Sequence, residues 1–288
     1  MNGGLVRLRE MVGHITPSER IIADYILAHP EQVAHMSVAD LAERSGGSQA
    51  AIIRLCKSLG LKGYPELKMK VIGDLQSKES YEYREFRPND PIATIVQNVS
   101  YNNMQSIRDT MKILDMDHLQ RAVEALSKAS RIFFYGTGAS NLIAQDAQQK
   151  FLRINKPSFT FADPTVQLTA AVTARADDVA VGISYSGETK PVIQSLIYAN
   201  EAGATTIGIT KYGHTTLSGV ASIPLHIAST ENEIRSGAMA SRIAQLNLID
   251  ILYLGVASSN YEEAVQYLKR SRNVLGDMEK IGESVRKN

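Results

Sequence analysis

The chain has 288 residues, of which 44% are hydrophobic and 21% charged, so it can form about two soluble domains with buried cores. Its formal net charge of +1 excludes a general electrostatic attraction to nucleic acid or membranes and leaves only local basic patches. Cys56 is the single cysteine, which excludes an intrachain disulfide. The first residues lack the apolar stretch of a signal peptide, and no apolar run approaches the ~18 residues of a membrane helix. We therefore expect a cytoplasmic protein.

The first element predicted along the chain is a helix that begins after Thr16, a residue type favoured at helix N-caps. Pro17 fits the first helical position, and Glu19 completes a capping box with Thr16. The helical spacing that follows predicts one apolar stripe, made of Ile21, Ile22, Tyr25 and Ile26.

A second, shorter helix is predicted to begin at Ser37, with Asp40 three residues later as its capping partner. It ends at Gly46 and Gly47, which can supply the left-handed backbone that a chain reversal needs. A third helix begins near Ser48. Its apolar positions at i, i+3, i+4 and i+7 predict a face that packs on the core, made of Ile52, Leu55, Cys56 and Leu59.

The opposite face of the third helix is polar and basic, as expected of a helix that reads the major groove of DNA. Glutamine and arginine contact adenine and guanine edges, and small apolar side chains contact thymine methyl groups. Residues 44–70 carry six basic side chains and one acidic one, Glu66, which gives this segment a net charge of +5. A small helical domain with a solvated basic face is the alternative. We predict a helix-turn-helix whose DNA-binding residues are Ser48, Gln49, Ala50, Ile53, Arg54, Lys57, Lys62 and Lys68.

Residues 77–90 are polar and charged, which predicts a linker between an all-α N-terminal domain (residues 1–76) and a C-terminal domain (residues 91–288). In the C-terminal domain, short β-branched or aromatic runs alternate with helical segments. This pattern predicts an α/β domain with a five-stranded parallel sheet flanked by helices. Pro224 cannot donate to a sheet, so the fifth strand starts there or lies at an edge. The predicted strands are Ile132–Tyr135, Phe159–Ala162, Val179–Ile183, Thr206–Thr210 and Ile223–Ile227.

Two of the predicted strand-to-helix turns, Gly136–Ser140 and Ser184–Thr189, are rich in glycine and hydroxyl side chains. Ligands of open α/β sheets bind at the carboxyl ends of strands, where helix N-termini offer free amide groups to an anion. Glycine lets the backbone approach the ligand, and serine and threonine add neutral donors for phosphate oxygens. The turns predict a phosphate site formed by Gly138, Ala139, Ser140, Ser184, Ser186, Gly187 and Thr189.

Three other interpretations of these turns fit the residues less well. A dinucleotide site needs a third glycine at the position where this chain has Asn141. Asp163, after the second strand, is placed where such a site has an acid that binds the ribose of the dinucleotide. A nucleophile elbow needs glycine in place of Ser186, and no histidine is well placed downstream. The third interpretation is that these are ordinary turns that happen to be rich in glycine and serine. It explains the composition of either turn alone, but it explains poorly why both turns share this composition.

The stretch from Thr16 to Leu75 resembles RpiR-type bacterial regulators, and the two turns resemble the sugar isomerase (SIS) domain that these regulators carry. Around residues 54–63, 146–150 and 241–250 the chain looks most like MurR-type regulators of N-acetylmuramic acid 6-phosphate utilisation. The resemblance implies a homodimer or homotetramer assembled through the SIS domain, which binds double-stranded operator DNA and controls sugar catabolism genes in response to a phosphorylated sugar effector. We expect a repressor, with an activator as the alternative.

Position by position, the resemblance assigns phosphate binding to four hydroxyl side chains of the turns, Ser140, Ser184, Ser186 and Thr189. It also matches Glu233 and Arg235 to a stretch that approaches the sugar in related domains. For these two residues, a surface loop is the alternative.

A sugar isomerase needs a base, usually glutamate or histidine, to move a proton between adjacent carbons. In SIS isomerases that resemble this chain, a glutamate late in the first crossover helix does so. This chain has Arg153 there, which stays protonated at neutral pH. Residues 163–176, where other isomerases carry a histidine, contain none. We therefore expect a binding protein with no catalytic residue, metal or cofactor; a sugar-phosphate isomerase with an accessory helical domain is the alternative.

Overall fold

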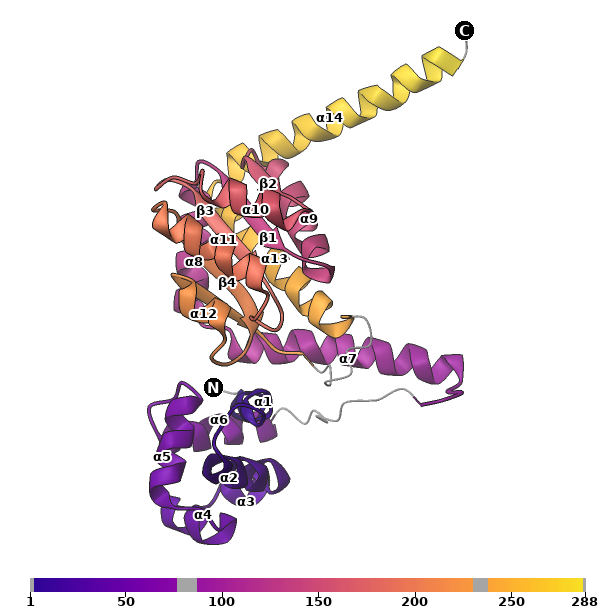
Figure 1. Cartoon of the computed structure of the whole chain (residues 1–288). Coiled ribbons are helices and arrows are strands. Elements are labelled where there is room, and N and C mark those ends of the chain that lie inside the picture. The colour runs from indigo at the N-terminus through magenta and orange to yellow at the C-terminus, as the bar shows by residue number, and fades with distance from the viewer. Residues whose placement is uncertain (1–2, 77–86, 230–237, 287–288) are drawn as a thin grey trace. The chain divides into compact units, whose positions relative to one another are not determined.

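A computed structural model of the chain describes residues 3–76, 87–229 and 238–286, with side chains as far as residue 274 (Figure 1). The chain divides into two compact units. The first comprises residues up to 114 together with 211–215 and 226–244, and the second comprises the remainder. No helix within the described ranges is long and apolar enough to cross a membrane.

The N-terminal part of the first unit is helical, as predicted. Thr16 and Glu19 form the expected capping box at the start of α2, and Ser37 and Asp40 form a second one at the start of α4. These caps satisfy amide groups that would otherwise lack partners in the first helical turn. The helices of this unit are α1 (Gly4–Met11), α2 (Pro17–Ala28), α3 (Pro30–Val33), α4 (Val38–Ser45), α5 (Gln49–Ser58), α6 (Tyr64–Gln76) and α7 (Ile92–Ile113).

The turn between α4 and α5 depends on two glycines for different reasons. Gly46 has a φ of 70°, the left-handed conformation that the sequence predicts at this helix end. At Gly47, a Cβ atom would lie 2.6 Å from the Cγ1 atom of Ile22, so glycine lets the turn approach α2. The Ser48 hydroxyl then accepts a hydrogen bond from the Ala51 amide at 3.2 Å and caps α5. Helices α4 and α5 thus form a helix-turn-helix.

Helix α1 is not predicted by the sequence analysis, because its cap comes from a distant residue. Its N-cap is Gly3, with a φ of 90° and no capping side chain of its own. Instead, the buried carboxylate of Asp74 on α6 accepts hydrogen bonds from the amides of Gly3 at 2.6 Å and Leu5 at 2.8 Å. A tertiary contact therefore takes the place of a local capping signal.

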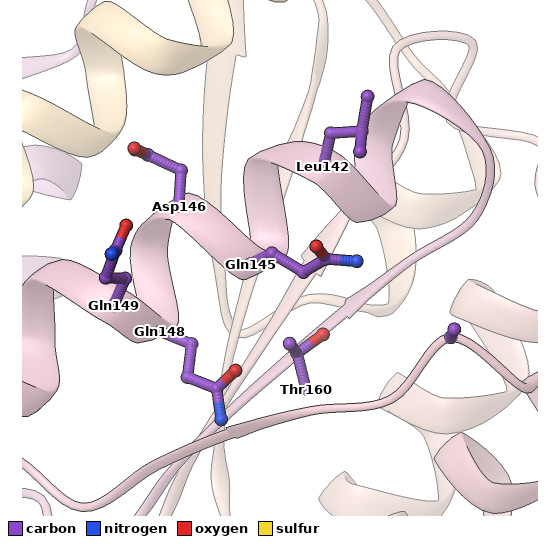
Figure 2. Close-up of a pocket in the computed structure, with 7 residues that line it drawn as sticks. Leu142, Gln145, Asp146, Gln148, Gln149 and Thr160 are labelled. Atoms are coloured by element: carbon purple, nitrogen blue, oxygen red, sulfur yellow. The ribbon is translucent and has the colours of Figure 1, made fainter. Parts of the chain in front are cut away.

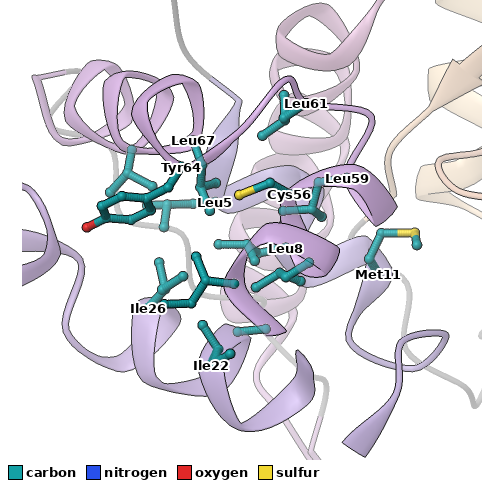
Figure 3. Close-up of a cluster of buried hydrophobic side chains, with 14 of the residues drawn as sticks. Leu5, Leu8, Met11, Ile22, Ile26, Cys56, Leu59, Leu61, Tyr64 and Leu67 are labelled. Atoms are coloured by element: carbon teal, nitrogen blue, oxygen red, sulfur yellow. The ribbon is translucent and has the colours of Figure 1, made fainter. Parts of the chain in front are cut away.

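Side chains of α1, α2, α5 and α6 share one apolar core (Figure 3). Ile22 and Ile26 of α2 are fully buried in it, whereas Ile21 is 52% exposed. Of the predicted apolar stripe, Ile21 therefore lies outside the buried part, about 100° around the helix from Ile22. The four core positions predicted on the third helix are confirmed as fully buried, namely Ile52, Leu55, Cys56 and Leu59.

The second unit contains most of a five-stranded sheet in the order β2-β1-β3-β4-β5. β1 pairs in parallel with β2 and β3, and β3 pairs in parallel with β4, which confirms the predicted parallel sheet. β5, which contains Pro224, lies at an edge as expected. The strands are β1 (Ile132–Gly136), β2 (Ser158–Thr160), β3 (Val179–Ile183), β4 (Thr205–Lys211) and β5 (Ile223–Ile227).

Helices cover both faces of the sheet (Figure 1). Successive side chains of β1 point to opposite faces. Phe133 and Tyr135 join a buried cluster with residues of α10, α11 and α12. Phe134 contacts Phe151 of α9, which in turn contacts Tyr253 of α13. The helices that follow α7 are α8 (Met116–Lys128), α9 (Ala139–Leu152), α10 (Pro164–Ala171), α11 (Lys190–Glu201), α12 (Thr216–Val220), α13 (Ala240–Ser259) and α14 (Tyr261–Arg286).

Candidate functional site

The two glycine- and serine-rich turns start side by side at the centre of the sheet. Gly136, the last residue of β1, is the register partner of Ile183, the last residue of β3. The strand order reverses at this point, since β2 lies on one side of β1 and β3 on the other. Open α/β sheets bind ligands at such a topological switch point. The fold therefore brings the two predicted turns together.

The second turn holds its hydroxyl groups in one cluster. The Ser184 side chain is buried, and its Oγ atom shares a hydrogen bond with Thr189 Oγ1 at 2.8 Å and a longer one with Ser186 Oγ at 3.4 Å. The Gly187 amide also donates to Ser184 Oγ at 3.1 Å. Three hydroxyls predicted to bind phosphate are thus neighbours, and we call them the hydroxyl cluster (Ser184, Ser186 and Thr189).

The hydroxyl cluster lies at the N-terminus of α11. Thr189 is the N-cap residue of this helix, but its side chain makes no capping bond to it. Pro191 has no amide hydrogen, so Lys190 and Val192 are the residues of the first turn that carry backbone donors. The positive end of the helix dipole favours an anion at this position.

The same turn is fixed to the start of α12. The Glu188 carboxylate accepts hydrogen bonds from the Thr216 amide at 2.9 Å and from the Thr216 hydroxyl at 2.6 Å. The Leu217 amide donates to the Gly187 carbonyl at 2.9 Å. The sequence carries no signal for this attachment, which joins the turn to the start of α12.

The first turn folds closely onto the end of β1. A Cβ atom at Gly136 would lie 2.6 Å from the Ser140 carbonyl oxygen, so only glycine fits. Gly138 is the N-cap of α9, with φ 55° and ψ −127°, a conformation that side chains disfavour. Ala139 and Ser140 follow as half-buried residues in the first turn of α9.

Sequence reasoning missed Gln167 on α10. Its side chain is fully buried, and its Nε2 atom donates hydrogen bonds to the carbonyls of Gly136 at 2.8 Å and Phe161 at 2.6 Å. It thereby joins the end of β1 to the segment that follows β2. The sequence gives no sign of this role, because a single glutamine in a short helix is ordinary.

Figure 2 shows an open, mostly polar depression of about 600 Å³ on α9 and the edge strand β2. None of the residues predicted to bind phosphate lines it. The lining residues are Leu142, Gln145, Asp146, Gln148, Gln149, Thr160 and Ala162.

Three further expectations concern the C-terminal domain. Arg153 is the C-cap of α9, at the opposite end of that helix from the Gly136–Ser140 turn. Glu233 and Arg235 lie outside the residues that the structure describes. Within the described parts of the chain, no group of three or more histidine, cysteine, aspartate or glutamate side chains is arranged to hold a metal ion.

Helix α5 presents the predicted DNA-reading face to solvent. Ile53 is 49% exposed, so its apolar side chain is accessible to a partner. Ser48 is exposed as well, although its hydroxyl also caps α5. The other exposed residues of this face are Gln49, Ala50, Arg54 and Lys57.

The two lysines predicted beyond α5 differ in their surroundings. Lys62 is exposed, and its backbone amide donates to the Glu66 carboxylate at 2.8 Å. The Lys68 ammonium donates to the Met36 carbonyl at 2.9 Å, so it also holds the segment between α3 and α4.

The end of α5 is attached to the start of α2 through Glu19. Its carboxylate accepts hydrogen bonds from the Thr16 amide at 2.9 Å, the Thr16 hydroxyl at 2.7 Å and the Ser58 hydroxyl at 3.1 Å. Burial alone would raise the pKa of Glu19, but these hydrogen bonds outweigh it and hold the pKa below its ordinary value of 4.5.

The comparisons with known proteins match both halves of the chain. The model of the rpiR-family helix-turn-helix domain matches residues 2–78, and the model of the SIS domain matches residues 125–255. The chain is 42% identical over 277 residues to the HTH-type transcriptional regulator YbbH of Bacillus subtilis. The matched region covers 96% of this chain and 98% of YbbH. It is 44% identical over 281 residues to the HTH-type transcriptional regulator TTE0211 of Caldanaerobacter subterraneus subsp. tengcongensis, covering 98% and 99% of the two chains.

A solved structure agrees with these relatives. The Vibrio vulnificus NanR protein, complexed with ManNAc-6P, is 28% identical to this chain and matches it with a TM-score of 0.60. The match covers 94% of this chain and 98% of the NanR chain. Because both domain models and two nearly full-length relatives agree, the chain belongs to the RpiR family of transcriptional regulators, with an N-terminal helix-turn-helix and a C-terminal SIS domain.

Proposed function

We propose that this regulator represses sugar catabolism genes by binding operator DNA through α5, and that a phosphorylated amino sugar bound at the hydroxyl cluster changes its affinity for DNA. N-acetylmuramic acid 6-phosphate is the first candidate, because the sequence looks most like MurR-type regulators. The NanR protein, which is similar over nearly its whole length, is complexed with another phosphorylated amino sugar.

The hydroxyl cluster at the switch point supports this proposal most directly. Its three hydroxyls converge at the N-terminus of α11, beside the turn that follows β1. Hydroxyls and backbone amides are neutral donors that suit the several oxygens of a phosphate group. The remaining positions of the site are Gly138, Ala139, Ser140 and Gly187, with Glu233 and Arg235 as candidates for contact with the sugar.

Binding without turnover is the second part of the proposal. The one carboxylate within the second turn, Glu188, already accepts two hydrogen bonds from Thr216. Arg153, which stands where the resemblance implies a glutamate base, stays protonated at neutral pH and cannot accept the proton. An isomerase remains the alternative function, and an assay of aldose–ketose conversion with purified protein separates the two.

The exposed face of α5 supports the proposal of DNA binding. We propose that Gln49 and Arg54 read base edges, that Ala50 and Ile53 touch thymine methyl groups, and that Lys57 contacts phosphate. Ser48, Lys62 and Lys68 complete the DNA surface. A homodimer or homotetramer assembled through the SIS domain would place two such helices on the two halves of an operator.

The test measures the affinity of the full-length protein for a labelled operator, selected from a random DNA pool, by fluorescence anisotropy. Titrations then add N-acetylmuramic acid 6-phosphate, N-acetylmannosamine 6-phosphate, glucosamine 6-phosphate or inorganic phosphate. We expect one of the amino sugar phosphates to weaken operator binding at lower concentration than inorganic phosphate. No response to any phosphorylated sugar would refute the proposal.

A serine variant and its matched control locate the site. Ser186→Ala is the suitable variant, since Ser186 is half-buried and its hydroxyl supports the turn less than that of Ser184 does. We expect it to bind operator normally and to lose the response to effector. The control is Ser259→Ala, an exposed serine at the end of α13 whose hydroxyl donates to the Gly255 carbonyl of the same helix at 2.9 Å. An unchanged response in Ser186→Ala would exclude the hydroxyl cluster as the effector site.

A further inference from the structure

Gln167 joins two neighbouring strand ends at the ligand edge of the sheet. Its Nε2 atom donates to the carbonyl of Gly136, the last residue of β1, at 2.8 Å. The same atom donates to the carbonyl of Phe161, the first residue after β2, at 2.6 Å. Its side chain has no exposed surface, so water does not compete for these bonds.

The bond to Gly136 holds a peptide group at the start of the Gly136–Ser140 turn. A peptide group is planar, so fixing the Gly136 carbonyl also fixes the plane that carries the Thr137 amide. Thr137 starts the turn, and the turn then packs so closely that a Cβ at Gly136 would lie 2.6 Å from the Ser140 carbonyl oxygen. A tilt of this one peptide would therefore move the backbone that leads to Ser140.

The bonding of Gln167 also argues against a purely stabilising role. Its Oε1 atom is buried and has no hydrogen-bond partner among the residues that the structure describes. A buried acceptor without a donor lowers stability, and methionine of similar volume would avoid that cost. What glutamine adds over methionine is the pair of donors that holds Gly136 and Phe161.

We propose that Gln167 is a positioning residue for the phosphate group, which acts through the Gly136 carbonyl and makes no contact with the ligand. The inference rests on the proposed function and extends it to regulation of affinity. Because Gln167 shapes the turn that faces the phosphate group, its loss weakens the binding of every phosphorylated sugar and of inorganic phosphate by the same factor.

The first test compares Gln167→Met with the wild-type full chain by isothermal titration calorimetry. We expect about tenfold weaker binding of N-acetylmuramic acid 6-phosphate, N-acetylmannosamine 6-phosphate and inorganic phosphate alike, with unchanged affinity for operator DNA. The matched control is Gln148→Met. Gln148 lies on α9 and donates in the same way to the Ser158 carbonyl at 3.0 Å, but at the start of β2 rather than at its carboxyl end (Figure 2).

The second test measures ligand affinity as a function of pH. If Gln167 had a merely structural role, the ratio of variant to wild-type affinity would not change with pH. In Gln167→Glu an ionised carboxylate has no donor and faces two carbonyl oxygens, whereas a protonated one can donate to one of them. We expect the ratio of its affinity to the wild-type affinity to rise as the pH falls from about 8 to about 6, the range in which a buried carboxyl takes up its proton. A ratio that stays constant would overturn the proposal.

The remaining outcomes are distinct. If the wild type binds no phosphorylated ligand, the proposed function fails and takes this inference with it. If the wild type binds and Ser186→Ala does not, but Gln167→Met binds normally, only the role of Gln167 is overturned. A loss confined to the sugar phosphates would show direct contact with the sugar, which also overturns it, and equal losses in both methionine variants would show a general effect of removing a glutamine.

Discussion

The Glu19 carboxylate on α2 accepts a hydrogen bond from the Ser58 hydroxyl at the end of α5, with 3.1 Å between the two oxygens. The same carboxylate accepts from the amide and hydroxyl of Thr16, so one side chain both caps α2 and holds the last residue of α5, the helix proposed to read DNA. This contact between α5 and α2 therefore depends on an ionised carboxylate.

Replacing Glu19 with glutamine should destabilise the helix-turn-helix by about 1–3 kcal/mol, because three charge-assisted hydrogen bonds are lost or weakened. Hydrogen–deuterium exchange of peptides from α2 and α5 measures the effect locally. Glu31→Gln, an exposed glutamate on α3, is the control. Equal exchange rates in both variants would contradict the proposed role of Glu19.

The contribution of Glu19 should also depend on pH. Its pKa is lower in the folded chain than the ordinary 4.5, so the stabilisation is fully present above that value and is lost as the pH falls through the folded pKa. The difference in stability between the wild type and Glu19→Gln should therefore be constant near neutral pH and shrink on acidification. Denaturation followed by circular dichroism at several pH values checks this, and a difference that grows in acid would refute it.

Arg54→Ala should reduce discrimination between operator and unrelated DNA by about 1–3 kcal/mol if its exposed guanidinium reads a base edge. Lys57→Ala serves as the comparison, because a phosphate contact weakens binding to all sequences and lowers the salt dependence of binding. Anisotropy titrations at several salt concentrations separate the two patterns. The same uniform loss in both variants would reassign Arg54 to the DNA backbone.

Gly136→Ala should disrupt the Gly136–Ser140 turn, which we propose contributes to the phosphate site, since the new methyl group would lie 2.6 Å from the Ser140 carbonyl oxygen. Overpacking of this kind costs about 1–3 kcal/mol, and we expect weaker effector binding with normal DNA binding. Gly219→Ala on α12 is the matched control, because a Cβ there meets no atom within 4 Å. Calorimetric titration with the effector provides the measurement, and normal affinity in Gly136→Ala would argue against a phosphate site at this turn.

Asp74→Ala should release the start of α1, because the amides of Gly3 and Leu5 would lose a buried acceptor. We expect the free energy of unfolding to fall by about 1–3 kcal/mol, and the hydrogen-exchange rate to increase most at α1. Asp24→Ala is the control, since Asp24 is exposed and pairs with Arg20 at 3.7 Å. Unchanged exchange in α1 would show that the Asp74 cap contributes little.

Elements with local signals could be predicted from the sequence. Thr16, Ser37 and Ser48 mark helix starts because their caps involve residues only three positions away. The parallel sheet follows from the alternation of apolar runs with helices. Since parallel strands end at the same edge, the placement of Gly136 and Ser184 at one edge of the sheet also follows from the pattern. That they are neighbours follows from the strand order, which the structure provides.

Features that depend on contacts between distant segments could not be predicted. Helix α1 is capped by Asp74, 71 positions from Gly3, and no local pattern records such a partner. Gln167 acts through bonds to backbone carbonyls on two strands, and a carbonyl is present at every position of a sequence. The exposure of Ile21 could not be predicted because an apolar residue beside a buried stripe looks the same in sequence whether it faces the core or solvent.

The mutual hydrogen bonds of Ser184 and Thr189 have a kinetic consequence. A phosphate arriving there would exchange bonds that the hydroxyls already make, so each new contact would add less net energy than its number suggests. With no lysine or arginine in the cluster, strong ion pairing would not prolong the stay of the anion. If the phosphorylated sugar leaves the site quickly, gene expression can follow a falling concentration of the sugar promptly. Neither the sugar nor the regulator then has to be degraded to end the response.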